Sequence, residues 1–219
     1  KMAQNRNVTK VLKPKIQDNL PEFDLLQGGV SDYDSISSVL VNECLVENFK
    51  TRRVSFNEVI FRNVKFINIS FEQAEFLDVR FENCDLSNVN LSESSIHRVE
   101  FINCKLTGSN FTESIFRNVM FDQCSGQYTC FRFTDFKQAV FSNCQLPYVD
   151  FYESEFSKLE FKDTDITQGQ FCNTKLKGMD FTSCRIDGIA AGVEDIRGAI
   201  ISYTQAVSLI SILGVVLKE

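Results

Sequence analysis

Eight cysteines and one histidine are the residues of this 219-residue chain whose chemistry could include metal binding, disulfide formation or nucleophilic catalysis. No CxxC pair occurs and there is no second histidine, so the spacing does not fit a zinc site. We predict no metal site, and we expect most of these thiols to fill small buried positions. Cys130 and Cys172 are expected to be outward thiols. The other six cysteines are twenty or forty residues apart: Cys44, Cys84, Cys104, Cys124, Cys144 and Cys184.

Catalytic groups are sparse elsewhere in the sequence. His97 directly follows an apolar residue of a regular series and is expected to face solvent. No glycine-rich phosphate loop is present. The neighbouring carboxylates Glu153 and Glu155 are typical of a solvated surface. We therefore predict no catalytic residue, no cofactor and no enzymatic activity.

The formal net charge of −6 bears on possible partners. Binding to nucleic acid phosphates or to anionic lipid requires a concentrated basic surface. We therefore expect no direct contact with nucleic acid and none with a membrane. Free thiols and the lack of a secretory signal predict a cytoplasmic location.

The spacing of phenylalanine identifies the elements that must position these residues. From residue 56 to 181, 26 positions are spaced by five, and 18 of them are Phe, five Leu, two Ile and one Gly. Two residues before each large position lies a small or β-branched one, such as Val59, Ala74 or Cys84. A period of five fits neither a helix nor a flat strand.

A second period of twenty residues is superimposed on the first. Phe-x-Asn-Cys or a close variant recurs at Phe81, Phe101 and Phe141. Four pentapeptides per coil predict an all-β fold, a right-handed quadrilateral parallel β-helix with the large and small series pointing inward. At about 4.8 Å per coil, about 8.5 coils would form a rod roughly 40 Å long. We expect the asparagines at 63, 83, 103 and 143 to bond corner backbone.

A solenoid filled by phenylalanine leaves no pocket in its interior. At Gly126 the large residue is missing, and we expect Tyr128 or Phe133 to fill the space rather than a functional groove to form. Residues 1–30 are off register and are expected to cover the first coil or to be partly disordered. The repeats are expected over residues 31–198.

Residues 199–219 are expected to form a C-terminal capping helix and dimerisation segment. Residues 198–217 carry no charge, but their pattern is amphipathic rather than membrane-spanning. Ser202 and Gln205 form a capping box, and Gly214 suits the C-terminal end of the helix. A strand-like segment is expected at residues 215–217. Whether this element only caps the solenoid or also contacts a second copy stays open at this point.

The five-residue pattern resembles the pentapeptide-repeat proteins, whose motif is a small residue, Asp or Asn, Leu or Phe, and two variable positions. Ser109-Asn110-Phe111-Thr112-Glu113 and Val149-Asp150-Phe151-Tyr152-Glu153 match it in full. The residue before the large position is looser here, as at Lys65, Glu75 and Ile115. This resemblance implies the fold but leaves the function open.

The C-terminal segment carries a more specific resemblance, to the Qnr quinolone-resistance branch of that family. The Qnr proteins end with an Asp-x-Arg-Gly step, an aromatic-Gln helix start, a Leu-rich turn and Leu-Gly followed by Val or Ile. The corresponding residues are Asp195, Arg197, Gly198, Tyr203, Gln205, Leu209, Leu213, Gly214, Val215 and Val216.

The resemblance to the Qnr proteins implies a homodimer that resembles duplex DNA and binds DNA gyrase or topoisomerase IV, protecting it from fluoroquinolones. The apolar stripe on the C-terminal helix then marks the expected dimer contact: Tyr203, Ala206, Leu209, Ile210 and Leu213. Some Qnr proteins have loops between coils, whereas residues 56–181 have none.

An acidic window near the proposed dimer centre is the expected topoisomerase-binding surface: Asp150, Glu153, Glu155, Glu160, Asp163 and Asp165. Two alternatives remain at this stage. The protein could confer immunity against a gyrase-directed peptide toxin, or it could be a scaffold solenoid without a topoisomerase target.

Overall fold

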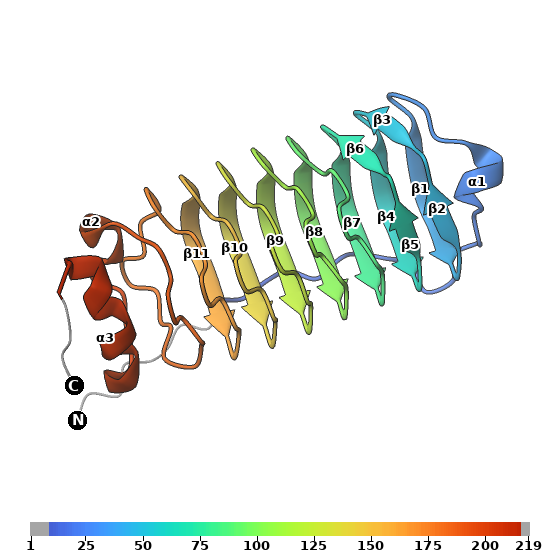
Figure 1. The fold of residues 1–219 in the computed structure, drawn as a ribbon. Coiled ribbons are helices and arrows are strands. Elements are labelled where there is room, and N and C mark those ends of the chain that lie inside the picture. Colours follow the sequence, from blue (N-terminus) through green and yellow to red (C-terminus); the bar gives the residue numbers. More distant parts are fainter. Residues whose placement is uncertain (1–8, 216–219) are drawn as a thin grey trace.

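The structure, a computed structural model, describes residues 9–215 and consists of flat coils stacked in a row (Figure 1). Its elements are α1 Leu25–Gly28, β1 Ser35–Asn42, β2 Leu45–Glu47, β3 Lys50–Arg52, β4 Ser55–Arg62, β5 Lys65–Ile67, β6 Ser70–Glu72, β7 Glu75–Glu82, β8 Ser95–Ile102, β9 Ile115–Asp122, β10 Asp135–Ser142, β11 Glu155–Lys162, α2 Val193–Ile196, α3 Tyr203–Leu209 and the 3-10 helix η1 Ile210–Leu213. The fold is the predicted parallel β-solenoid, closed at the C-terminal end by short helices.

The strands pair in parallel, and each residue lies opposite the residue twenty positions earlier or later in the chain. The long strands form one seven-stranded sheet in the order β1-β4-β7-β8-β9-β10-β11. Two shorter sheets, β2-β5 and β3-β6, begin the neighbouring sides. Isolated bridges continue these sides, as between Asn110 and Cys130 and between Asp165 and Arg185. The register therefore confirms the period of twenty.

The backbone turns at the second residue after each large apolar position, here called the corner position. Twenty-eight residues other than glycine have positive φ between Tyr33 and Asn173, and all occupy this position. A left-handed residue between two extended segments turns the chain. The turn occurs even within the long strands, since β8 bends at Arg98 (φ 51). Four such turns make a coil with four sides.

Phenylalanine columns fill the interior. One column runs from Phe61 to Phe181, with consecutive ring centroids 4.5 to 5.9 Å apart and interplanar angles of at most 24°. Phe111, Phe131, Phe151 and Phe171 form a second column, spaced by 5.0 to 5.3 Å. Stacked rings add about 0.5–1.5 kcal/mol per pair beyond the burial of their area. The sequence period of five therefore sets the core.

Five of the six cysteines in the series are buried, as predicted, and Cys44 is half-buried. Cys84, Cys104, Cys124 and Cys144 are buried and free, and each thiol contacts the carbonyl oxygen of a phenylalanine one coil earlier at 3.3 to 3.4 Å. Burial raises the pKa of the Cys184 thiol, which keeps it protonated near neutral pH. These thiols act as small core residues.

Two local predictions were wrong. Three of the asparagine side chains bond one another rather than corner backbone, since the Asn103 amide donates to Asn83 and the Asn83 amide to Asn63, at 2.9 and 3.1 Å. The Asn143 amide donates to the Ser142 hydroxyl at 3.0 Å. At Gly126, Tyr128 and Phe133 stay exposed. A Cβ there would clash with the Thr129 hydroxyl and meet Leu106 and Leu146 at 3.0 Å, so Thr129 and leucines of the adjacent coils close the space.

The N-terminal segment extends far beyond the first coil. Residues 9–20, here called the strap, run along the outside of the seven-stranded sheet towards α1 (Figure 1). The backbone amides of Thr9, Leu12 and Lys15 donate to Glu160 of β11, Asn118 of β9 and Asp78 of β7. Residues 21–23 then pair with Leu40 at the first coil. Residues 1–8 lie outside the described part of the chain.

The C-terminal cap forms as the capping box predicts. The Gln205 amide donates to the Ser202 hydroxyl at 3.3 Å, and the Ser202 amide donates to the Gln205 side-chain oxygen at 2.8 Å. The Gln205 side chain also donates to the carbonyls of Phe181 and Cys184. It thereby ties α3 to the last coil. Gly214 has φ +70, as expected after a helix, and residues 216 and 217 lie outside the described range.

Candidate binding surfaces

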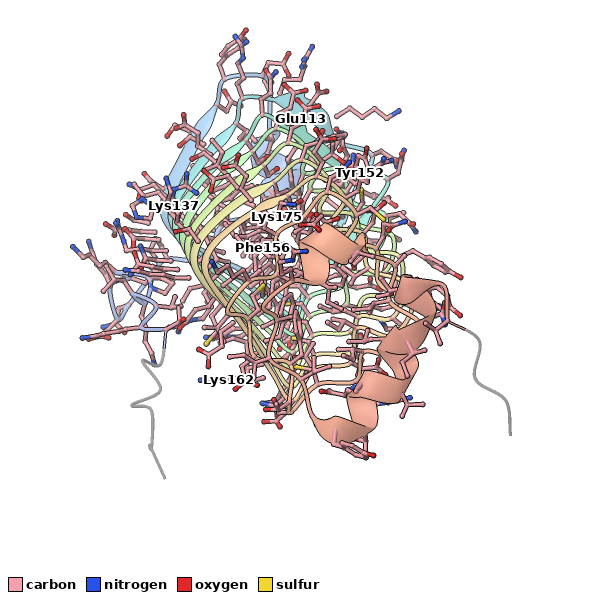
Figure 2. All side chains as sticks on the ribbon, turned by 90° about the vertical axis from the view of Figure 1, so that its left-hand side faces the viewer. Glu113, Lys137, Tyr152, Phe156, Lys162 and Lys175 are labelled. Atoms are coloured by element: carbon pink, nitrogen blue, oxygen red, sulfur yellow. The ribbon has the colours of Figure 1, made fainter. Side chains whose placement is uncertain are left out.

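The filled interior places every candidate site on the outside of the solenoid or at its ends. Within residues 9–215 no group of three or more His, Cys, Asp or Glu side chains is placed to hold a metal ion. None of the helices in this range has the length and apolar character to cross a membrane. Figure 2, viewed along the coils from the C-terminal end, shows side chains projecting on all sides.

An apolar cavity of about 350 Å³ lies at the C-terminal end, between the last coil and the cap. Side chains of Ile196, Ala199, Ile201, Leu209 and Ile212 are among those that line it. Three of the predicted dimer residues, Ala206, Leu209 and Ile210, line this cavity.

The predicted dimer residues occupy two different faces of the cap. Leu209 is buried, so it holds α3 to the solenoid rather than being free for a partner. Tyr203 is 91% exposed, and Leu213 ends η1. Sequence reasoning missed Val207, which is 54% exposed and one helical turn after Tyr203.

Asp195 of the Asp-x-Arg-Gly step has a structural position that the motif alone did not indicate. Its carboxylate accepts from the Lys175 ammonium at 3.0 Å and from the backbone amides of Asn173 and Gly192. Burial opposes its ionisation, but these three donors hold the pKa of Asp195 below its ordinary value. The motif thus joins α2 to the last coils.

The predicted acidic surface is a band around one coil rather than a single face. Asp150 to Asp165 extend over most of one coil, so their side chains leave the solenoid on different sides. Three of them are paired with cations: Asp150 with Arg132, Asp165 with Arg185 and Glu160 with Lys162. Glu153, Glu155 and Asp163 form no ion pair within the described residues.

His97 lies outward on β8 and is partly covered. Burial and the neighbouring Arg98 guanidinium lower the pKa of its imidazole, while Asp78 opposes them. The ring nitrogen Nε2 lies 3.3 Å from the Arg98 guanidinium. Asp78 is bound by both Arg98 and the strap, so His97, Arg98 and Asp78 belong to the contact between the strap and the solenoid.

An aromatic face, missed by sequence reasoning, lies on two adjacent coils. It consists of Tyr128, Arg132, Phe133, Tyr148 and Tyr152. The rings of Tyr128 and Tyr148 stack at 5.0 Å, and those of Phe133 and Tyr152 meet edge-on at 5.7 Å. The phase of the repeat could have identified it, since none of these residues falls on an inward position.

A parallel β-solenoid with a filled core and exposed binding surfaces is the class of protein that this geometry defines. The family model for the pentapeptide repeat region matches residues 54–128 and 94–171, which together make up more than half of the chain. The chain belongs to the pentapeptide-repeat family.

Solved structures of similar proteins include QnrB1, described as a plasmid-mediated fluoroquinolone resistance protein. A trypsin-treated variant of it is 17% identical, with a TM-score of 0.47, over 87% of this chain and 99% of the other. HetL, described as involved in heterocyst differentiation regulation in the cyanobacterium Nostoc, is 12% identical, with a TM-score of 0.30, over 78% of this chain and 90% of the other. No curated protein sequence matches the chain significantly.

Proposed function

We propose that this protein is a dimer that binds DNA gyrase or topoisomerase IV and protects it from fluoroquinolones, without enzymatic activity of its own. It acts as a duplex-shaped ligand that competes with DNA or disturbs the drug-trapped cleavage complex. We place it in the cytoplasm, where its target works.

The observation that carries this proposal is the Qnr-like order of residues at the C-terminal end, from Asp195 to Gly214 and Val215. Several of these residues have defined positions in the cap: Asp195 holds α2, Gln205 holds α3, and Gly214 ends η1. The exposed apolar side chains of Tyr203 and Val207 support a contact between two copies through this cap.

The acidic band supports the target side of the proposal. Topoisomerases bind DNA, and a surface that replaces DNA must present negative charge to them. Because Glu153, Glu155 and Asp163 are not neutralised by ion pairs within the described residues, they are the members of the band available to a basic partner.

The test is a supercoiling assay with purified gyrase, relaxed plasmid and ciprofloxacin, run with and without this protein. We expect micromolar protein to restore supercoiling in the presence of the drug. A reaction without drug separates protection from direct inhibition. A parallel decatenation assay with topoisomerase IV identifies the preferred target.

A matched variant tests the acidic band in the same assay. Glu153→Gln, Glu155→Gln and Asp163→Asn together remove three charges at exposed positions and leave the ion pairs of the band intact. We expect this variant to need several-fold more protein for the same protection. If wild-type protein neither restores nor inhibits supercoiling, the protective function is wrong, and immunity to a peptide toxin or a scaffold role becomes the better explanation.

A further inference from the structure

The aromatic face is an outward surface that the fold does not require. Tyr128 and Tyr148 occupy one corner ladder, and Phe133 occupies the next. Their φ values of 59°, 60° and 58° lie in the left-handed region, which is unfavourable for bulky side chains and favourable for Asn or Gly. In the coils before them, the corner ladder of Tyr128 carries Asn48, Asn68 and Asn88.

These rings remain open to a partner. The exposed fractions are 59% for Tyr128, 44% for Tyr148 and 43% for Phe133. In Figure 2, Tyr152 and Glu113 both project on the side of the solenoid away from Lys137, which precedes the strap contact Gln138. The strap therefore leaves this side free.

The local charge favours a cationic partner. Over the segments 107–114, 127–134, 147–154 and 167–174, which form this side in four coils, three carboxylates stand against one cation. The carboxylates are Glu113, Asp150 and Glu153, and the cation is Arg132. Nucleic acid would be repelled by this balance.

Arg132 shows that a guanidinium group fits against the rings of the aromatic face. Its guanidinium lies 4.8 Å from the ring centroid of Tyr152 and 5.5 Å from that of Phe133. It also lies within ion-pair distance of Asp150, at 3.6 Å. A guanidinium between aromatic rings and a carboxylate is a favourable arrangement. The stacked rings of Tyr128 and Tyr148, one corner away, hold no cation among the described residues.

We propose that the aromatic face, centred on Tyr128 and Tyr148, binds an arginine-bearing segment of a partner protein. Guanidinium groups of the partner stack on the two tyrosine rings and pair with the free carboxylates at Glu113 and Glu153. Tyrosine and arginine are the residues that most often dominate the binding energy of protein interfaces. The proposal holds whether or not the partner is a topoisomerase.

The test measures binding of an (Arg-Gly-Gly)4 peptide by calorimetry to wild-type protein and to the variant Tyr128→Asn with Tyr148→Asn. Asparagine is the residue found at the same corner in other coils, so the variant keeps the fold and the net charge. We expect the dissociation constant to rise about fivefold or more, because two cation–π contacts are lost. Tyr33→Asn makes the same change at a distant corner and should leave binding unchanged.

Two further probes complete the test. A (Lys-Gly-Gly)4 peptide should bind more weakly than the arginine peptide, since ammonium lacks the planar stacking surface. The oligonucleotide dT12 should not bind. The proposal is overturned by equal peptide affinity of wild-type and double-variant protein, by undetectable peptide binding at millimolar concentration, or by preferential binding of dT12. Loss of protection against ciprofloxacin is a separate readout, so failure here would not imply failure of the proposed function.

Discussion

At the scale of single residues, the repeat decides which side chains enter the core, and exceptions to it have measurable costs. Thr51 occupies a large apolar position, is 4% exposed, and its hydroxyl finds no hydrogen-bond partner within the described residues. A buried polar group without a partner destabilises the folded state by about 1–3 kcal/mol. Thr134, in contrast, occupies a small inward position and donates to the Phe131 carbonyl at 2.7 Å.

This contrast predicts opposite effects of one substitution. Thr51→Val should raise the free energy of unfolding by about 1 kcal/mol, because valine keeps the shape and removes the unpaired hydroxyl. Thr134→Val should lower it by about as much, since a formed hydrogen bond is lost. Urea titration followed by circular dichroism measures both changes. A less stable Thr51→Val protein would show that the hydroxyl has a partner in solution.

The same scale shows what sequence reasoning can and cannot reach. The inward direction of Cys84 and the other cysteines of its series was predictable, because the position of a residue in the repeat decides where its side chain points. The closure around Gly126 was not, because it combines the Thr129 hydroxyl with Leu106 and Leu146 of the neighbouring coils. The amide ladder from Asn63 to Asn103 likewise depends on contacts between coils, not on the local turn.

At the scale of elements, the strap is the feature without a sequence signal. Its contacts with Asn118 and Asp78 join residues 106 and 63 positions apart, and they involve outward side chains that the repeat leaves unspecified. Val140 and Glu100 lie at outward positions and are nevertheless buried, with exposed fractions of 8% and 3%. Glu100 accepts from the Arg80 guanidinium at 2.8 Å. The cap, in contrast, was predictable because a capping box is a local motif.

Asp78 makes attachment of the strap depend on pH. The Arg98 guanidinium contacts both of its carboxylate oxygens at 2.6 Å, and the Lys15 amide donates at 2.8 Å. Burial opposes ionisation, yet these donors hold the pKa of Asp78 below its ordinary value of 3.8. A lowered pKa means that the stabilisation is present above the unfolded value and is lost as pH falls through the folded one.

We therefore expect the Lys15 amide signal in NMR to keep its bound position down to about pH 4 and to shift towards its free position below it.

At neutral pH, Asp78→Asn should speed hydrogen exchange of residues 9–20 about tenfold, since hydrogen bonds to charged groups contribute about 1.5–3 kcal/mol. Glu43→Gln, at an exposed corner, is the control and should change nothing. Unchanged exchange in Asp78→Asn would show that the other strap contacts, such as those with Glu160 and Asn118, hold the strap without Asp78.

At the scale of the whole molecule, the two ends of the solenoid differ in how completely their apolar side chains are covered. The N-terminal end is covered by Phe23 and α1, where Leu25 is 1% exposed. The C-terminal end is covered by α3, but Tyr203, Val207 and Ile200 remain exposed there, at 91%, 54% and 45%. Exposed apolar side chains on this cap favour association, which supports the proposed contact between two copies at the C-terminal end.

Val207 is the position at which the dimer proposal can be tested without damage to the monomer. Leu209 is less suitable, because its burial against the last coil means that a charge there would detach α3. Val207→Glu places a carboxylate on the exposed side of the helix, where only a dimer would bury it. An unpaired buried charge is strongly unfavourable, so we expect the solution mass to fall to half at micromolar concentration. Sedimentation equilibrium measures this mass, and Gln123→Glu, which adds the same charge at an exposed corner, should leave it unchanged. A wild-type monomer would contradict the proposed dimer, and a Val207→Glu protein that keeps the dimer mass would place the contact elsewhere.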